Sequence, residues 1–211
     1  MPEQLADQKA ALARIQEHLE KSSERVLIGI IGKPGAGKST LSKFLMGKLP
    51  KDLVTVVPMD GYHLSNKVLK DLKRSDRKGA PDTFDVAGFV SLVKRIRSEQ
   101  TQNIYYPIFD RAIEESIAAQ GVVTSATKVV IIEGNYLLHD EGGWEVLNDL
   151  LDESWMVDVD DDKRISRLIS RHIAYGKDPE AAKAWAKGTD EVNAKLIERG
   201  RIRADFVVAI D

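Results

Sequence analysis

A glycine-rich stretch near the start of the chain has the residue types and spacing of a phosphate-binding loop. Residues 32–39, GKPGAGKS, fit the pattern G-x-x-x-x-G-K-[ST] at every position, after an apolar run and before a helical one. Gly35 and Gly37 let backbone N–H groups turn inward, and the helix N-terminus adds free donors and partial positive charge. Lys38 can reach the β- and γ-phosphates, and the Ser39 hydroxyl can hold Mg²⁺. The pattern predicts a bound nucleoside triphosphate, for which ATP is the default, and the residues that hold it are Gly32, Lys33, Pro34, Gly35, Ala36, Gly37, Lys38, Ser39 and Thr40.

Two further carboxylates stand at the ends of apolar runs. Asp60 follows residues 53–59, LVTVVPM, and Glu133 is the next-to-last residue of 128–134, KVVIIEG. Because parallel strands end at one edge of a sheet, both carboxylates should face the phosphate loop. Glu133 can bind Mg²⁺ together with Ser39, or it can cap a helix or pair at the surface. Asp60 can accept a hydrogen bond from an attacking hydroxyl and take its proton; its alternatives are a magnesium–water ligand and a turn-forming Asp-Gly pair.

Arginines follow the fourth apolar run at helical spacing. Arg164, Arg167 and Arg171 are separated by three and four residues, so they share one helical face. We expect residues 161–190 to form a lid from which Arg167 and Arg171 neutralise charge on the transferred phosphoryl group. An arginine in that role contributes about 10³–10⁵ in rate. The alternative is a solvated basic face that pairs with the acidic residues 160–162.

Apolar runs of strand length alternate with helical stretches along the chain. The runs are residues 25–31, 53–59, 128–134, 154–160 and 204–210. The helical stretches are residues 39–48, 86–99, 143–151, 161–175 and 179–199, and the polar stretch 70–85 is typical of a surface loop. Continuous apolar runs suit parallel strands that are buried on both faces. We therefore expect an α/β fold, the P-loop NTPase three-layer sandwich, with a five-stranded parallel sheet, helices on both faces and an arginine-bearing lid.

The N-terminal segment, residues 1–22, predicts an amphipathic helix. Within residues 3–21, Leu5, Leu12, Ile15 and Leu19 form one apolar stripe. Such a helix packs on the surface of its own chain or binds a partner, and a second copy of this chain would make a homodimer. The three tryptophans, Trp144, Trp155 and Trp185, are expected in the core.

The composition limits the class of protein. Its 211 residues suit one domain, 1–211, with a sizeable core. The net charge of -2 provides no overall field that would recruit nucleic acid or an anionic membrane. The absence of cysteine excludes disulfides, thiolate metal sites and thiol nucleophiles. We find neither the apolar region of a signal peptide nor a membrane-spanning run of roughly 20 apolar residues, and we expect a cytoplasmic protein without membrane insertion.

Several segments together resemble the phosphoribulokinase/uridine kinase group, which includes bacterial pantothenate kinase. The resemblance covers roughly residues 25–175 and rests on MDGYHLSNKVL (59–69), RKGAPDTFD (77–85), YYPIFDR (105–111) and IEGN (132–135). The tail at residues 171–197 looks like that of short bacterial relatives described as fructose-transport-system or nucleoside/nucleotide kinases. Pantothenate kinases are much longer, and they carry a substrate-contacting histidine where this chain has Arg111.

The resemblance implies a magnesium-dependent kinase that passes the γ-phosphoryl group of ATP to a hydroxyl of a small metabolite. Sugars such as fructose rank first as the acceptor, then nucleosides, then pantothenate. Asp60 would be the catalytic base, and Ser39 and Glu133 would serve magnesium. These roles add to those that the residue patterns predict for Lys38, Arg167 and Arg171. Asp110 and Arg111 would face the acceptor, and the matching segments add Tyr62, Asn66 and Lys78 to that side. Independently of the resemblance, His63 can touch the substrate or simply form a hydrogen bond near the turn. Phe109 can line the acceptor pocket or only its core-facing wall.

Two other readings of these residues remain open. In a nucleotide-hydrolysing switch or regulatory ATPase, Asp60 would orient water instead of an acceptor hydroxyl. A partner of a transport system that only senses nucleotide would need no base, so the intact set of Lys38, Ser39, Asp60 and Glu133 argues against it. Substantial turnover without an acceptor would distinguish the switch from the kinase.

Overall fold

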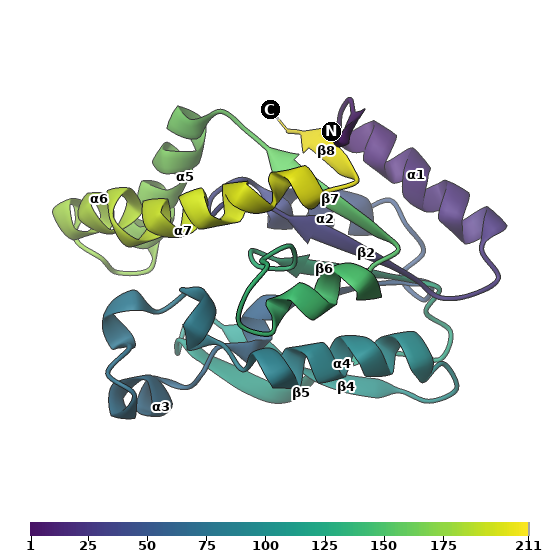
Figure 1. The fold of residues 1–211 in the computed structure, drawn as a ribbon, viewed down its shortest axis with the longest axis horizontal. Coiled ribbons are helices and arrows are strands. Elements are labelled where there is room, and N and C mark those ends of the chain that lie inside the picture. The colour runs from purple at the N-terminus through teal and green to yellow at the C-terminus, as the bar shows by residue number, and fades with distance from the viewer. Residues whose placement is uncertain (211) are drawn as a thin grey trace.

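The computed structural model describes residues 1–210, and its centre is a parallel β-sheet between two layers of helices (Figure 1). Within these residues the sheet has six strands in the order β1-β8-β7-β2-β6-β3, all parallel. The strands are β1 (Glu3–Leu5), β2 (Val26–Ile31), β3 (Val54–Pro58), β6 (Val129–Gly134), β7 (Glu153–Asp158) and β8 (Phe206–Ala209). The expected α/β class with helices on both faces is confirmed.

The count of five strands was wrong by one, because β1 lies in the segment expected to be helical. Glu3–Leu5 pair with Phe206–Val208 and extend the sheet at one edge. The helix α1 (Gln8–Lys21) begins only after Asp7, whose side chain accepts hydrogen bonds from the N–H groups of Lys9 and Ala10. A three-residue strand of mixed polarity carries no periodic signal, so it could not be separated from the helix by pattern alone.

Each face of the sheet buries alternate side chains of the same strands. Leu27 and Ile31 of β2 face one layer, and Ile28 and Ile30 face the other. The first layer consists of α4 (Val86–Ser98), η4 (Trp144–Leu150) and α7 (Thr189–Glu198). The second layer consists of α1 and α2 (Lys38–Met46). Residues of β2 are buried on both sides, which explains why the strand reads as one apolar run.

The helix α1 is docked on the sheet by both apolar and polar contacts. Ala11 and Ile15 are fully buried in the core between this layer of helices and the sheet. Arg14 Nε and His18 Nε2 lie 2.9 and 2.7 Å from Oε1 of the buried Glu153 at the start of β7. The apolar stripe of this helix therefore packs on its own chain.

The remaining helices correct two predicted boundaries. Within the predicted helical stretch 143–151, residues 144–150 form the 3₁₀ helix η4, and the stretch 179–199 divides into α6 (Pro179–Lys187) and α7 at Gly188. The helix α5 (Asp161–Ala174) follows β7, and the predicted lid, 161–190, comprises α5, α6 and the start of α7. The polar stretch 70–85 contains the end of α3 (Asn66–Asp71) and the 3₁₀ helices η2 (Ser75–Arg77) and η3 (Pro81–Thr83), with Phe84 buried.

A two-stranded antiparallel hairpin lies outside the main sheet and was not predicted. It consists of β4 (Ile104–Asp110) and β5 (Glu115–Val123), with a register shift between Tyr106 and Ile108. The Tyr106 hydroxyl donates to the carbonyl of Val56 at 2.8 Å, which fixes the hairpin against β3. Pro107 interrupts β4, and most of β5 is exposed, so neither strand has the apolar pattern of a core strand. Among residues 1–210, no helix is both long and apolar enough to span a lipid bilayer.

Replacement of Arg25 by methionine is expected to lower the free energy of unfolding by about 3 kcal/mol. The guanidinium of this buried residue donates to four carbonyl oxygens, those of Ile96, Glu99, Thr124 and Thr127. The substitution would leave buried acceptors without a donor at the C-terminus of α4. Chemical denaturation measures the loss, and Arg95→Met, which removes an exposed arginine of α4, should change stability by less than about 0.5 kcal/mol. Equal losses in the two variants would contradict this account.

Candidate active site

The phosphate-binding loop connects β2 to α2 at the carboxyl edge of the sheet. Gly35 and Gly37 have φ angles of 79° and 97°, in the left-handed region that favours glycine. A Cβ atom on Gly35 would lie 2.7 Å from the carbonyl oxygen of Arg164, so the loop also packs closely beneath α5. Gly37 is the N-cap of α2, whose first N–H groups are therefore free to bind an anion.

Lys38 lies across this loop with its amine held by backbone oxygens. Its Nζ donates to the carbonyl of Gly32 at 2.9 Å and to that of Lys33 at 3.4 Å. Burial lowers the pKa of Lys38 to about 8, although the carboxylates of Glu133 and Asp60 oppose the shift. The amine is thus poised to gain charge stabilisation when phosphate groups enter the loop.

Glu133 and Ser39 are brought into direct contact at the end of β6. The Ser39 hydroxyl donates to Oε1 of Glu133 at 2.5 Å, and the Ser42 hydroxyl donates to Oε2 at 2.8 Å. Glu133 pairs with Pro58 of β3 and Ile30 of β2, so β6 carries it between the other two strands of the site. A hydroxyl and a carboxylate side by side at the phosphate loop are the oxygen donors that Mg²⁺ prefers, so these residues fit that ion.

Asp60 lies in the short 3₁₀ helix η1 (Met59–Tyr62) directly after β3. Its Oδ2 accepts a hydrogen bond from Arg111 Nη2 at 2.7 Å. Burial by itself would raise the pKa of Asp60, but the positive charges of His63, Arg111 and Lys38 outweigh it and hold that pKa below its usual value. The group is therefore an ionised carboxylate at neutral pH, able to accept a hydrogen bond from a substrate hydroxyl.

Gly61, the residue after Asp60, packs directly against the hairpin. A Cβ atom there would lie 2.0 Å from the carbonyl oxygen of Pro107 in β4. The absent side chain thus leaves room for the hairpin backbone. Because Pro107 is fixed in β4, this contact holds the turn that carries Asp60 against the hairpin.

His63 forms an aromatic wall beside Asp60. Its Nδ1 donates to the backbone carbonyl of Asp60 at 2.8 Å, since a carbonyl can only accept. The ring lies between those of Phe84 and Phe109, with centroids 4.1 and 4.7 Å away. Burial lowers the pKa of His63, and the charge of Asp60 opposes that shift.

Lys78 and Asn66 meet the tip of the hairpin. Lys78 Nζ donates to Oδ1 of Asn66 at 2.7 Å and to the carbonyl of Glu114 at 2.8 Å. Asn66 Nδ2 donates to the same carbonyl at 3.1 Å, and Glu114 adopts a left-handed conformation with φ 55°. The lysine also lies over the ring of Phe109, with Nζ 5.1 Å from its centroid. These contacts hold the lysine amine at the edge of the site.

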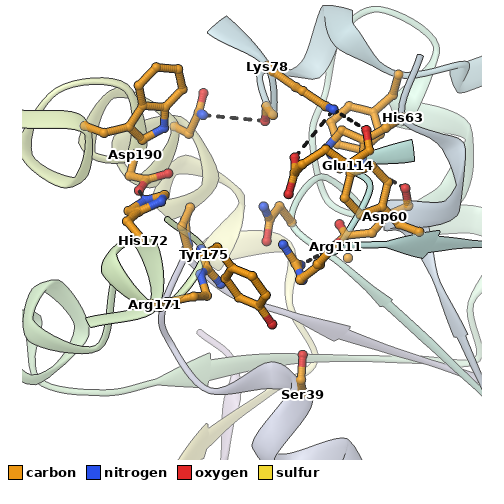
Figure 2. A pocket seen from close by; sticks show the side chains of 18 of the residues that line it. Ser39, Asp60, His63, Lys78, Arg111, Glu114, Arg171, His172, Tyr175 and Asp190 are labelled. Atoms are coloured by element: carbon orange, nitrogen blue, oxygen red, sulfur yellow. Dashed lines mark hydrogen bonds and ion pairs between the residues drawn. The ribbon is translucent and has the colours of Figure 1, made fainter. Parts of the chain in front are cut away.

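The predicted lid supplies the opposite wall through α5. Arg171 and Tyr175 extend from this side toward Arg111, above Ser39 (Figure 2). Burial and the nearby charge of Arg111 lower the pKa of Arg171. The two guanidinium groups are therefore close enough to repel each other. Arg167 lies over the phosphate loop, with Nη1 3.5 Å from the position of a Cβ on Gly37.

Arg164 is the third residue on this helical face and is almost fully buried. It donates to Asp161 at 2.8 Å, to Glu191 at 2.5 Å and to the carbonyl of Pro34 at 3.5 Å. These contacts tie α5 to α7 and to the phosphate loop. Of the three arginines on this helical face, Arg164 therefore has a structural role, and Arg167 and Arg171 lie near the loop.

The side of the cleft near α6 and α7 adds groups that the sequence analysis did not assign to the site. His172 Nε2 lies 2.7 Å from Oδ2 of the buried Asp190, which links α5 to α7. Trp185, expected in the core, lines the cleft instead, with Lys177 Nζ 4.5 Å from its ring centroid. Trp185 lies on the amphipathic helix α6, and the sequence pattern of such a helix does not show whether an apolar side chain faces the core or a cleft.

All these elements enclose one cleft of about 390 Å³. The predicted residues that line it are Pro34, Lys38, Ser39, Asp60, His63, Lys78, Phe109, Arg111, Glu133 and Arg171. The structure does not bring Tyr62 or Asp110 into the lining. The Tyr62 ring packs on Phe89 at 5.3 Å, and Asp110 Oδ1 accepts from the N–H of Ala112 at 2.8 Å, in the hairpin turn. Asn66 acts from outside the lining by holding Lys78.

Comparison with known proteins assigns this arrangement to a family. The family model described as "Phosphoribulokinase / Uridine kinase family" matches residues 27–210. The chain belongs to the phosphoribulokinase/uridine kinase family. The resemblance noted in the sequence is confirmed, and family membership implies a P-loop kinase that binds ATP.

Similar proteins come from fungi and bacteria. A provisionally assigned uridine kinase of Schizosaccharomyces pombe is 32% identical over 203 residues, which cover 90% of this chain and 85% of that protein. An ATP-dependent kinase-like protein of Aspergillus versicolor is 35% identical over 159 residues, which cover 71% of this chain and 92% of that protein. The crystal structure of a provisionally assigned fructose transport system kinase from Silicibacter sp. TM1040 has a TM-score of 0.85 and 39% identity, and the match covers 95% of this chain and 98% of that one.

Several members of this kinase cleft escaped the sequence analysis. Glu114 stands at the tip of an unpredicted hairpin, and Ser75 and Gly79 belong to the polar stretch 70–85. The stretch RKGAPDTFD did carry a signal for Gly79, because it was part of the resemblance. The carbonyl of Gly79 accepts from the Tyr136 hydroxyl at 2.6 Å, a contact between distant segments that spacing alone does not reveal.

Proposed function

We propose that this chain is a magnesium-dependent kinase that transfers the γ-phosphoryl group of ATP to a hydroxyl of a small metabolite. The observation that carries the proposal is the carboxylate of Asp60 in the same cleft as Lys38 and Ser39, close enough to Lys38 for their charges to shift each other's pKa. A protein that only binds nucleotide needs no such carboxylate. Sugars or sugar-like alcohols are the leading class of acceptor, since one similar structure is described as a fructose transport system kinase.

The proposed step is an in-line displacement at the γ-phosphorus. The acceptor hydroxyl attacks that phosphorus, the bond from phosphorus to the β,γ-bridging oxygen breaks, and ADP leaves. Asp60 accepts the hydroxyl hydrogen bond and takes the proton as the new phosphorus–oxygen bond forms. Its position in η1, fixed by the contact between Gly61 and Pro107, defines where the acceptor oxygen must lie.

Cationic side chains on two sides of the cleft stabilise the transferred charge. Lys38 reaches the phosphates from the loop, and Arg167 and Arg171 lie on α5 above it. Ser39 and Glu133 would hold Mg²⁺ through oxygen atoms already in contact. When bound, that ion offsets the negative charge of the phosphate oxygens.

The test is acceptor-dependent release of ADP from the purified chain. The protein is incubated with ATP, Mg²⁺ and a panel of sugars, sugar phosphates, hydroxy acids, polyols, nucleosides and pantothenate. We expect at least one acceptor to raise ADP release by 10²-fold or more over the rate without acceptor, with a phosphorylated product visible by mass spectrometry. Rapid hydrolysis that no acceptor changes would instead identify a nucleotide-dependent switch, in which Asp60 orients water.

A further inference from the structure

In this structure the carboxylate of Asp60, the proposed base, forms an ion pair with Arg111 from the acceptor side of the cleft. Arg111 Nη2 donates to Oδ2 of Asp60, and the two side chains are 41% and 34% exposed. An attacking hydroxyl needs an oxygen of this carboxylate as its acceptor. An ion pair of this exposure contributes little free energy, so a ligand can replace either partner.

Arg111 lies in a part of the cleft that other cations also line. Its charge lowers the pKa values of Lys38 and Arg171, which shows that three cations share this part of the cleft. Lys38 belongs to the phosphate loop and Arg171 to α5, whereas Arg111 follows β4 in the hairpin turn. An arginine displaced from Asp60 in such surroundings calls for a new anion on the hairpin side.

Lys78 presents a second cation at the same place. Its amine is held by two neutral oxygens, and the Glu114 carboxylate is 3.5 Å away on a side chain that is 52% exposed. Lys78 thus pairs with Glu114 in an exposed ion pair, which an anionic ligand can replace as readily as the pair of Arg111 and Asp60. Lys78 Nζ and Arg111 Cζ lie 5.1 and 5.9 Å from the centroid of the Phe109 ring, so one aromatic side chain supports both cations. Figure 2 shows Lys78 and Arg111 on the same side of the cleft, facing the residues of α5.

We propose that the acceptor carries a phosphate or carboxylate group in addition to its hydroxyl, and that Arg111 and Lys78 bind this group beside Phe109. Arg111 then exchanges Asp60 for the acceptor anion, which opens the carboxylate to the hydroxyl. Without acceptor, Arg111 keeps the base paired and so protects ATP from hydrolysis. The inference deepens the proposed kinase function and rests on it: it selects sugar phosphates and hydroxy acids over free fructose and nucleosides.

Matched acceptors that differ in charge test this selection directly. Fructose is compared with fructose 6-phosphate, glycerol with glycerate, and panthenol with pantothenate, each with ATP and Mg²⁺. We expect the charged member of at least one pair to have a kcat/KM at least 10²-fold above that of its neutral counterpart. The first pair tests a phosphate and the other two test a carboxylate, so the result also identifies the anion.

Variants then connect the charge preference to the two cations. Arg111→Gln and Lys78→Gln are each expected to raise the KM of the charged acceptor by about 10- to 100-fold, as loss of one charged hydrogen bond predicts. At saturating acceptor, kcat should fall by less than tenfold. Arg95→Gln, which removes an exposed arginine outside the cleft, is the matched control and should leave both constants as they are.

Three outcomes would overturn the inference in distinguishable ways. A preference for the neutral member of each pair would refute the anionic acceptor while leaving the kinase proposal intact. An equal fall in kcat for charged and neutral acceptors in Arg111→Gln, with KM unaltered, would place Arg111 on the transferred phosphoryl group instead. If no acceptor of either kind were phosphorylated, the kinase proposal itself would fail and the inference with it.

Discussion

Asp60→Asn is expected to lower acceptor-dependent ADP release by about 10²–10⁴-fold, while the affinity for ATP changes by no more than a few-fold. The amide keeps the shape of the side chain but cannot take a proton from the acceptor. The surrounding cations hold the pKa of Asp60 below its usual value, so the wild-type group is ready as a carboxylate throughout the neutral range. A loose transition state keeps the hydroxyl proton in place until late, so a weakly basic carboxylate suffices.

The measurement is kcat at saturating ATP, Mg²⁺ and the best acceptor of the panel, with ATP affinity from an equilibrium titration. Asp149→Asn, which neutralises an exposed carboxylate outside the cleft, is the control and should retain full activity. Loss of ATP binding in Asp60→Asn would show that the carboxylate organises the nucleotide site rather than the acceptor. Near-normal turnover would remove Asp60 from the chemistry altogether.

Lys38→Met is expected to have the second largest effect, a loss of about 10²–10³-fold in kcat/KM for ATP. The methionine fills the same volume but removes the one amine that the loop directs at the phosphate position. Loss of this side chain should weaken nucleotide binding as well as turnover, in contrast to Asp60→Asn. Lys43→Met, an exposed lysine on the same helix α2, serves as the control. Equal ATP affinity in Lys38→Met and wild type would contradict the role of the loop.

The lowered pKa of Lys38 predicts a pH dependence of ATP affinity that the wild type should show and Lys38→Met should lack. Burial lowers this pKa to about 8, so above pH 8 the amine of the empty site is largely neutral. Bound triphosphate favours the charged form, and binding must then take up a proton. ATP affinity should therefore be level below pH 8 and fall by up to about tenfold per pH unit above it. In Lys38→Met that slope should be absent.

The parts of the site that follow from topology were accessible from the sequence. The phosphate loop is a local pattern, and the positions of Asp60 and Glu133 follow once β3 and β6 are parallel to β2, because parallel strands end at one edge. The helix α4 begins at Val86, where the predicted helical stretch 86–99 begins, since the Asp85 side chain caps it by accepting from the N–H of Gly88 at 2.9 Å. In each case one short segment carries the whole signal.

The parts that depend on contacts between distant segments were not accessible. The hairpin lacks a core pattern because it is supported by Tyr106 and by contact with η1, and Glu114 at its tip was missed with it. Arg164 shares its spacing with Arg167 and Arg171, but Asp161 and Glu191 draw it into the interior. Helical spacing predicts which face of a helix carries a side chain, but the ion-pair partners of that side chain determine whether it is buried or faces the cleft.

The close approach of Gly61 to the carbonyl of Pro107 limits how the acceptor specificity of this chain could change. Since the two backbones leave no gap there, a change of acceptor cannot be achieved by sliding the hairpin relative to the turn after β3. A new specificity must instead arise from substitution of side chains, while the backbone keeps the hairpin at a constant distance from Asp60. One scaffold can then serve acceptors of different size and polarity without rebuilding its chemistry.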